Sequence, residues 1–181
     1  MNTPRVVYTA DQIHRRLEEL VAEISSDYEG KELILVGILK GSAFFLADTA
    51  RLFGPSVALD FEFVDVTTST GERGEVVSLT FATRINVTDR HVLILKDVLH
   101  SGVTENYLIT HLSQQTPASI EVAALVDKPQ MRSVNLSARY AAFTDVPNGF
   151  LIGYGLGPGH GRHTNLPDLC VIPEGEESAS P

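Results

Sequence analysis

The stretch from Val92 to Thr104 constrains the fold of this chain most strongly. It begins with the four apolar residues Val92–Leu95, a pattern typical of a strand that is buried on both faces of a parallel sheet. A short polar turn with Ser101 and Gly102 follows, and then a helical pattern. Backbone N–H groups at such a turn, together with the positive end of the helix dipole, bind phosphate or another anion. Because open sheets bind ligands at the carboxyl ends of their strands, the sequence predicts an anion site here.

The rest of the chain alternates between strand-like and helix-like segments. Thr9 and Gln12 fit a capping box that begins a helix, and apolar residues then recur at helical spacing. Helices are expected at about residues 10–25, 43–53 and 103–114. Further strands are expected at residues 33–38, 57–66, 76–81, 119–126, 140–143, 150–153 and 169–172, with the last closing the sheet. This order predicts an α/β fold with a mainly parallel sheet and right-handed crossovers.

Two segments carry few apolar residues. Residues 67–74 are polar and rich in Thr and Gly, so they are expected to form a flexible loop. Residues 174–181 contain three glutamates, small residues and a terminal proline, a composition typical of a disordered acidic tail. Without an internal repeat or a long linker, residues 1–173 are expected to form a single domain.

Composition excludes several classes of protein. The chain has 181 residues, of which 43% are hydrophobic and 20% are charged, as in ordinary globular proteins. It contains no apolar run of membrane-spanning length, and the residues Met1–Arg5 lack a signal-peptide h-region, so neither a membrane span nor a secretory leader is expected. The single cysteine, Cys170, cannot form an intrachain disulfide, so a cytoplasmic location is expected. A net charge of −9 argues against nucleic-acid binding as the main function.

The stretch from Val92 to Thr104 resembles the phosphoribosyl-diphosphate-binding motif of type I phosphoribosyltransferases. In that motif an apolar strand leads into two acidic residues, two apolar residues and then Asp-Thr/Ser-Gly-x-Thr. Asp97, Ser101, Gly102 and Thr104 match it, whereas Lys96 and His100 stand at acidic positions.

Three further segments narrow the resemblance to hypoxanthine–guanine phosphoribosyltransferases. Leu39-Lys40-Gly41-Ser42, Asp127-Lys128-Pro129 and the run from Phe150 to Leu156 match the family in the right order. The match extends from about residue 7 to residue 172. It implies the type I phosphoribosyltransferase fold, in which helices flank a mainly parallel sheet and short strands form a small hood.

The resemblance implies a role for each group of matching residues. It assigns phosphate binding to Ser101, Gly102, Val103 and Thr104, and pyrophosphate binding to Lys40, Gly41 and Arg162. It assigns base binding to Lys128, Phe150 and Leu151, and catalysis to Asp97 and His100. Asp97 would hold the ribose, and His100 would act near purine N7, because a histidine with a pKa near 6.5 can still transfer protons.

These roles agree with the chemistry of the side chains. The ring of Phe150 can stack on a purine, an interaction worth about 1–3 kcal/mol for nucleic-acid bases. The Lys128 ammonium can donate to the 6-oxo group, and the backbone at Leu151 can bond the purine edge. Taken alone, Lys128 is also typical of a solvated turn and Phe150 of a core residue.

The family also implies Mg²⁺, a purine base or nucleotide and phosphoribosyl diphosphate as ligands, and a homo-oligomer (dimer or tetramer). The metal ligands of this chain stay unknown, because Gly157 stands at the position of a metal-linked aspartate and Lys96 replaces an acid. Magnesium prefers hard oxygen ligands. The lid tyrosine of the family is absent beside Thr68-Ser69.

Three hypotheses for function follow. The first is a purine-salvage enzyme that transfers phosphoribose to hypoxanthine or guanine. The second is a nucleotide-binding protein that lacks turnover, since phosphate- and base-binding parts are kept while family acids are replaced. The third is an enzyme with an altered substrate, in which the segment His160–His163 binds an anion. A metal site formed by His100, His160 and His163 is a further interpretation.

Overall fold

The computed structural model describes residues 4–71, 74–81, 85–157 and 163–172, with the side chains of residues 68–77 left out of the description. Its main sheet has six strands in the order β4-β3-β2-β5-β6-β7. All neighbouring pairs are parallel except β3 and β4. The strands are β2 (Glu32–Leu39), β3 (Ala58–Gly71), β4 (Gly74–Phe81), β5 (His91–Leu99), β6 (Ser119–Asp127) and β7 (Tyr140–Phe143). The predicted α/β fold with a mainly parallel sheet is therefore confirmed.

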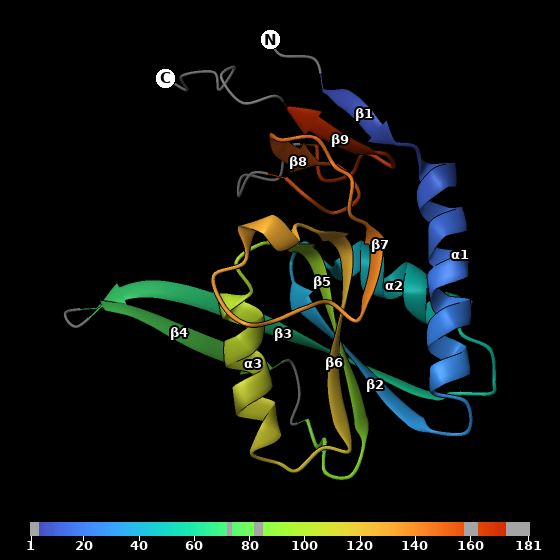
Figure 1. The fold of residues 1–181 in the computed structure, drawn as a ribbon, viewed down its shortest axis with the longest axis vertical. Coiled ribbons are helices and arrows are strands. Elements are labelled where there is room, and N and C mark those ends of the chain that lie inside the picture. Colours follow the sequence, from blue (N-terminus) through green and yellow to red (C-terminus); the bar gives the residue numbers. More distant parts are fainter. Residues whose placement is uncertain (1–3, 72–73, 82–84, 158–162, 173–181) are drawn as a thin grey trace.

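Three helices cover the two faces of this sheet (Figure 1). They are α1 (Ala10–Asp27), α2 (Ala43–Leu52) and α3 (Val103–Ser113). The predicted capping box begins α1, since Thr9 Oγ1 accepts from the backbone N–H of Gln12 and the Gln12 side chain accepts from the N–H of Thr9. Each predicted helix is present within two residues of its expected ends.

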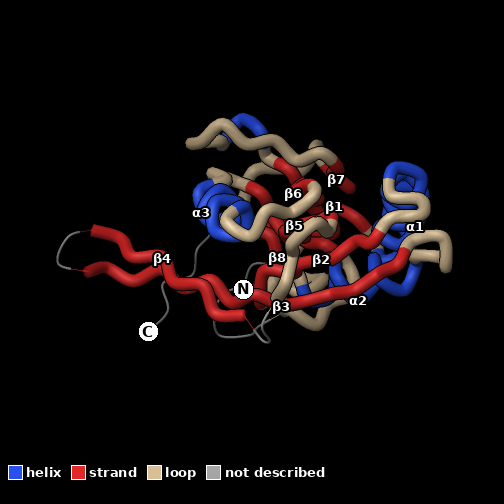
Figure 2. The backbone as a smooth tube through the Cα atoms, turned by 90° about the horizontal axis from the view of Figure 1, so that it is seen from below, coloured by secondary structure: helices blue, strands red, loops and turns tan. Residues whose placement is uncertain are grey.

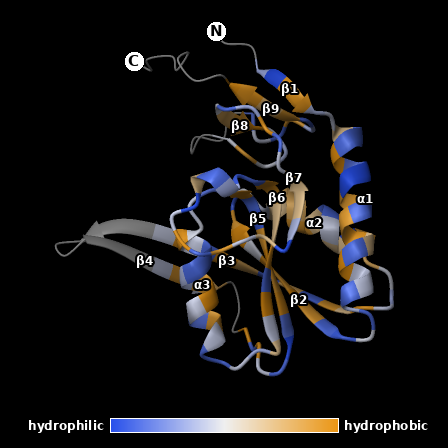
Figure 3. Cartoon of the chain, viewed as in Figure 1, coloured by the Kyte–Doolittle hydropathy of each residue, from blue (hydrophilic) through white to orange (hydrophobic). Residues whose placement is uncertain are grey.

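Successive residues of the central strands pack against opposite layers. Leu33 and Leu35 of β2 share a core with α1 and α2, whereas Ile34 and Val36 share a second core with α3. The side chains of β5 alternate in the same way, with Leu93 in the first core and Ile94 in the second. This alternation follows from the two-residue period of a strand. Figure 3 shows the apolar residues concentrated on the central strands and on the inner side of α1.

A separate three-stranded antiparallel sheet, here called the hood, lies beyond one end of the main sheet (Figure 1). Its order is β1-β9-β8, formed by β1 (Arg5–Tyr8), β9 (Leu169–Ile172) and β8 (Phe150–Ile152). The prediction that residues 169–172 close the main sheet is therefore wrong. β9 instead finds antiparallel partners on both sides, β1 and β8, and the edge of the main sheet is β7.

The polar segment at residues 67–74, predicted to be a flexible loop, also differs from its prediction. Residues 67–71 continue β3 and residue 74 begins β4, with Thr67 paired to Ser78 and Gly71 to Gly74. The pair forms a long hairpin that projects from the body of the molecule (Figure 2). Threonine has a high strand propensity, and pairing with β4 supplies hydrogen-bond partners for the backbone of this polar segment. A flexible loop over residues 67–74 is therefore wrong, apart from residues 72–73, which lie outside the described part.

A short 3₁₀ helix, η1 (Pro129–Met131), follows β6 and was not predicted. The acidic tail at residues 174–181 lies outside the described residues, so its predicted disorder stays a prediction. Within the described part of the chain, none of the helices is long and apolar enough to cross a membrane.

Candidate active site

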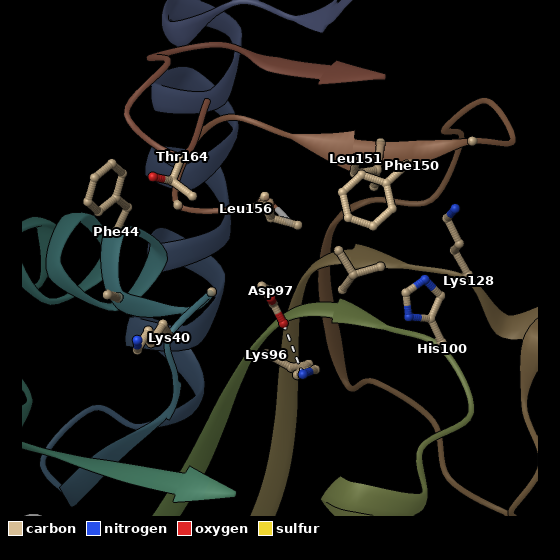
Figure 4. A pocket seen from close by; sticks show the side chains of 16 residues that line it. Lys40, Phe44, Lys96, Asp97, His100, Lys128, Phe150, Leu151, Leu156 and Thr164 are labelled. Atoms are coloured by element: carbon tan, nitrogen blue, oxygen red, sulfur yellow. Dashed lines mark ion pairs between the residues drawn. The ribbon is translucent and has the colours of Figure 1, made fainter. Parts of the chain in front are cut away.

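The carboxyl ends of β2, β5 and β6 meet the hood around a cavity of about 630 Å³, a size usual for small-ligand sites. Figure 4 shows side chains from both sheets directed into it. The residues predicted for the site that line the cavity are Lys40, Gly41, Asp97, His100, Lys128, Phe150 and Leu151. The structure thus brings seven of the predicted site residues together from four separate segments.

The Asp97 side chain lies directly against the backbone of the turn after β2. A Cβ atom added at Gly41 would overlap the Asp97 carboxylate and would lie 2.6 Å from its Cγ. Glycine is required here because another chain segment fills the space of the side chain. The Leu39–Lys40 peptide bond in the same turn is cis, and the Lys40 side chain is exposed beside the cavity.

The segment that follows strand β8 of the hood also lies against this turn. A Cβ added at Gly155, whose φ is +89°, would lie 2.9 Å from the carbonyl oxygen of Gly41. The neighbouring Tyr154 is buried, donates from its hydroxyl to Asp48 Oδ2 of α2 at 2.7 Å, and packs edge-on against Phe44. The segment that follows β8 is therefore fixed against α2 and the Gly41 turn. Burial, reinforced by the Asp48 carboxylate, raises the pKa of Tyr154, so its hydroxyl remains a donor at neutral pH.

The opposite end of the cavity carries an aromatic ring and a largely buried lysine. Phe150 is 47% exposed although it belongs to a strand whose next two residues, Leu151 and Ile152, are buried. Lys128 is only 6% exposed, and its backbone N–H donates to the carbonyl of Leu99 at 3.0 Å. Figure 4 shows the Lys128 and His100 side chains below Phe150. An exposed ring above polar donors is suited to a flat heteroaromatic ligand.

The turn Ser101–Thr104 adjoins the cavity without lining it. Gly102 is the N-cap of α3 with a left-handed φ of +78°, a conformation that favours glycine. Leu136 and Val134 would lie 3.1 Å from an added Cβ, so little room exists for a side chain. The first N–H groups of α3 follow directly, and such groups lack partners within their own helix. The predicted strand end joined to a helix start is thus present, and anion binding at this turn stays a prediction.

His100 lies among cations. Burial, followed by the positive charges of Lys128 and Lys96, lowers the pKa of His100 below its ordinary value of 6.5, against a smaller opposite effect of Asp97. The imidazole is therefore neutral at pH 7, with one nitrogen free to accept a proton.

Comparisons with known proteins agree with this geometry. The model of the family described as "Phosphoribosyl transferase domain" matches residues 7–156. The hypoxanthine-guanine phosphoribosyltransferase of Streptococcus pneumoniae is 34% identical over 170 residues, covering 94% of this chain and 93% of that protein. The chain belongs to the hypoxanthine-guanine phosphoribosyltransferase family.

Solved structures of this family share the fold. A hypoxanthine phosphoribosyl transferase of Trypanosoma cruzi superposes with a TM-score of 0.85 at 32% identity, covering 95% of this chain and 92% of that one. A hypoxanthine-guanine phosphoribosyltransferase of Bacillus anthracis gives 0.83 at 29% identity, covering 95% and 99%. The type I phosphoribosyltransferase fold expected from the resemblance is therefore confirmed.

Sequence reasoning missed two charged residues beside the site. Arg132 donates from Nη1 to the carbonyl oxygens of Leu99, at 2.8 Å, and of His100, and from Nη2 to the Asp127 carboxylate. It thereby ties the ends of β5 and β6 together. Glu105, on the first turn of α3, is 3% exposed and lies 3.6 Å from Lys96 Nζ. A signal for Glu105 existed in the sequence, because an acid in a first helical turn is favoured by the helix dipole.

Two predicted positions cannot be placed. Arg162 and His160 lie outside the described residues, so the pyrophosphate role of Arg162 stays a prediction. The three-histidine metal site depends on His160 and is equally untested. Gly157 lines the cavity and supplies no side chain there.

The family implies magnesium, and the described residues at the β5 end do not fit an ion held by the protein. Asp97 Oδ1 lies 3.0 Å from the Lys96 ammonium, which also faces Glu105. Magnesium requires several oxygen ligands at about 2.0–2.1 Å, and here a positive charge already occupies the space beside the carboxylate. Within the described ranges, His, Cys, Asp and Glu form no group of three or more that could hold a metal ion.

The contact between Gly41 and Asp97 gives a testable prediction. Gly41→Ala should displace the Asp97 carboxylate and lower phosphoribosyltransferase kcat/KM by about 100-fold, since small misplacements of reacting groups cost that much. Gly54→Ala is the matched control, because a Cβ there meets nothing within 4 Å. Steady-state kinetics of both variants would check this. Equal activity of the two would contradict the packing argument.

Proposed function

We propose that this chain transfers the phosphoribosyl group of phosphoribosyl diphosphate to hypoxanthine or guanine in purine salvage, with release of pyrophosphate. The observation that carries the proposal is the cavity in which the Lys40–Gly41 turn, Asp97, His100, Lys128 and Phe150 converge, in a chain of this family. The names of the curated relatives are those of enzymes. They favour turnover over the hypothesis of a binding protein without activity.

The base would bind between the hood and the end of β6. Phe150 presents its ring to the cavity, and stacking on a base contributes about 1–3 kcal/mol. The ammonium of the largely buried Lys128 would donate to the 6-oxo group of the purine. Backbone groups of Leu151 would meet the purine edge. A ligand with a ring face and an exocyclic acceptor suits this part of the cavity.

The phosphoribosyl group would extend from the base toward α3 and the Gly41 turn. Its 5′-phosphate would accept from N–H groups of Ser101, Gly102, Val103 and Thr104, because a helix N-terminus favours an anion. The ribose hydroxyls would donate to Asp97. The pyrophosphate would lie on the backbone at Lys40 and Gly41, with Arg162 as a further cation.

His100 would remove a proton during the transfer. When N9 of the purine forms its bond to C1′ of the ribose, the C1′–oxygen bond to pyrophosphate breaks. The excess proton on N7 then has to leave, and neutral imidazole can accept it. The resulting imidazolium would return the proton to solvent.

The same proposal extends to the organisation of the protein. Residues 1–173 would form one phosphoribosyltransferase domain, followed by a disordered tail at 174–181. Ligands would be a purine base or nucleotide and phosphoribosyl diphosphate, in a cytoplasmic homo-oligomer. The altered-substrate hypothesis rests on residues 160–163, of which only His163 is described.

Base selection by Lys128 can be tested directly. The purified chain with phosphoribosyl diphosphate should convert hypoxanthine and guanine to their nucleoside monophosphates and should leave adenine unchanged, because an amino group cannot accept from an ammonium. Lys128→Met should lower kcat/KM for both 6-oxopurines about 10- to 100-fold, the value of a hydrogen bond from a charged donor. Product would be followed by liquid chromatography.

The controls for this assay are Lys31→Met, an exposed lysine outside the cavity, and Asp97→Ala in the site. Lys31→Met should behave as the wild type, and Asp97→Ala should lose turnover. Absence of product with every 6-oxopurine would overturn the proposed function.

The pH dependence of the reaction should report His100. Because the pKa of His100 is lowered, the accepting neutral imidazole persists at pH 7 and is lost as the pH falls through a value below 6.5. The profile of kcat/KM should therefore be flat around pH 7 and should decline only below about 6.5.

His100→Asn should lower kcat/KM by about 10²- to 10⁴-fold and remove this acidic limb. His14→Asn, on the exposed side of α1, is the matched control and should keep it. A limb that survives in His100→Asn would assign the proton acceptor to another group.

A further inference from the structure

Lys96 and Asp97 are adjacent in β5 and reach different layers of the molecule. Their side chains leave opposite faces of the strand. Asp97 lies against Gly41 on the face covered by α1 and α2, and Lys96 reaches Glu105 on the face covered by α3. The long stem of Lys96 still brings its ammonium to 3.0 Å from Asp97 Oδ1 (Figure 4). One cation is thus shared by two carboxylates from different elements.

Both carboxylates depend on this cation. Asp97 Oδ1 and Glu105 Oε1 are buried oxygens without a hydrogen-bond partner among the described residues, and the Lys96 ammonium lies within 3.0 Å of the first and 3.6 Å of the second. An unpaired buried carboxylate oxygen is costly, so the ammonium compensates the negative charge on two oxygen atoms that water does not reach. The carboxylates outweigh the effect of burial and raise the pKa of Lys96, which keeps it protonated.

We propose that the Lys96 ammonium, held between Asp97 and Glu105, is a built-in cation at the ribose end of the site and takes the place of a divalent metal held by the protein. The inference rests on the proposed function for the location of the ribose. Lys96 is then a positioning residue: it fixes the Asp97 carboxylate and balances its charge. Glu105 holds the ammonium from the opposite side.

The geometry explains why a dication is excluded. A divalent ion bound to Asp97 Oδ1 at the usual distance of about 2.1 Å would lie within about 5 Å of the ammonium. The two charges of the ion and the one charge of the ammonium would then be balanced by only two carboxylates, those of Asp97 and Glu105. The other described titratable side chains that line the cavity are His100, which is neutral, and the cations Lys40 and Lys128. They add no anionic ligand.

The first test is metal binding to the protein alone. Mn²⁺ titrations followed by electron paramagnetic resonance would compare the wild type with Lys96→Glu and with Arg15→Glu, which makes the same charge change on the exposed surface of α1. Lys96→Glu should gain a Mn²⁺ site at least tenfold tighter than any site of the wild type or of Arg15→Glu. A wild type that binds Mn²⁺ as tightly as Lys96→Glu, or a folded Lys96→Glu without a gain, would overturn the proposal.

The second test uses the unmodified chain, so it holds even where Lys96→Glu does not fold. Inosine monophosphate is the probe because it lacks the diphosphate that would itself carry a metal. Its Kd, measured by calorimetry, should agree within twofold between EDTA and millimolar Mg²⁺. Binding weakened more than tenfold by EDTA would overturn the proposal. Absence of nucleotide binding under both conditions would count against the proposed function, and the wild-type Mn²⁺ titration would still decide the role of Lys96.

Discussion

Burial of β5 on both faces is the constraint on which the rest of the structure depends. Val92–Leu95 are fully enclosed between the layer of α1 and α2 and the layer of α3, so polar chemistry is displaced to the carboxyl end of the strand. Because β2 and β6 run parallel on either side, their own carboxyl ends arrive at the same edge. The cavity is therefore a consequence of sheet direction, and the hood encloses what the main sheet leaves open.

The charges gathered at this edge differ from those of the whole chain. The protein carries a net charge of −9, yet the cavity is lined by Lys40, Lys96 and Lys128 with Asp97 as its carboxylate. Desolvated charges interact more strongly than exposed ones. The local excess of positive charge, and not the net charge of the chain, therefore determines which ligands the cavity attracts. Burial, reinforced by the cations Lys128 and Lys96, lowers the pKa of His100, so this histidine stays uncharged at neutral pH. An acidic surface and a cationic cavity together favour small anions over nucleic acid.

Much of the fold and most of the site could be predicted from short segments. The Val92–Thr104 stretch predicts a strand, a tight turn and a helix because each has a strong local signal, and the family motifs place Lys128 and Phe150 in one site. The pairing of β9 could not be predicted, because a four-residue apolar strand fits either sheet equally well. The polarity of Thr67–Gly71 indicates a loop, although strand pairing depends on a partner, β4, that composition does not reveal.

Arg132 and Glu105 escaped prediction for a related reason. Their roles arise from contacts across elements: Arg132 bonds to carbonyls more than 30 residues away, and Glu105 meets a lysine nine positions earlier across the strand-to-helix turn. Neither spacing has a periodic signature. The sequence marks Lys96 as a departure from the family motif, but its carboxylate partner on α3 becomes visible only when the strand and the helix are placed together.

The contacts among Gly41, Asp97 and Gly155 have a consequence for ligand size. At this point the turn after β2 and the segment after β8 approach at the level of their backbones, with the Asp97 carboxylate against the same turn. Side chains elsewhere in a cavity can change rotamer to admit a larger group. Here no adjustable side chain separates the two backbone segments, so a bulkier ligand would require the hood to move as a body. The width of the cavity at this end is set by the main chain.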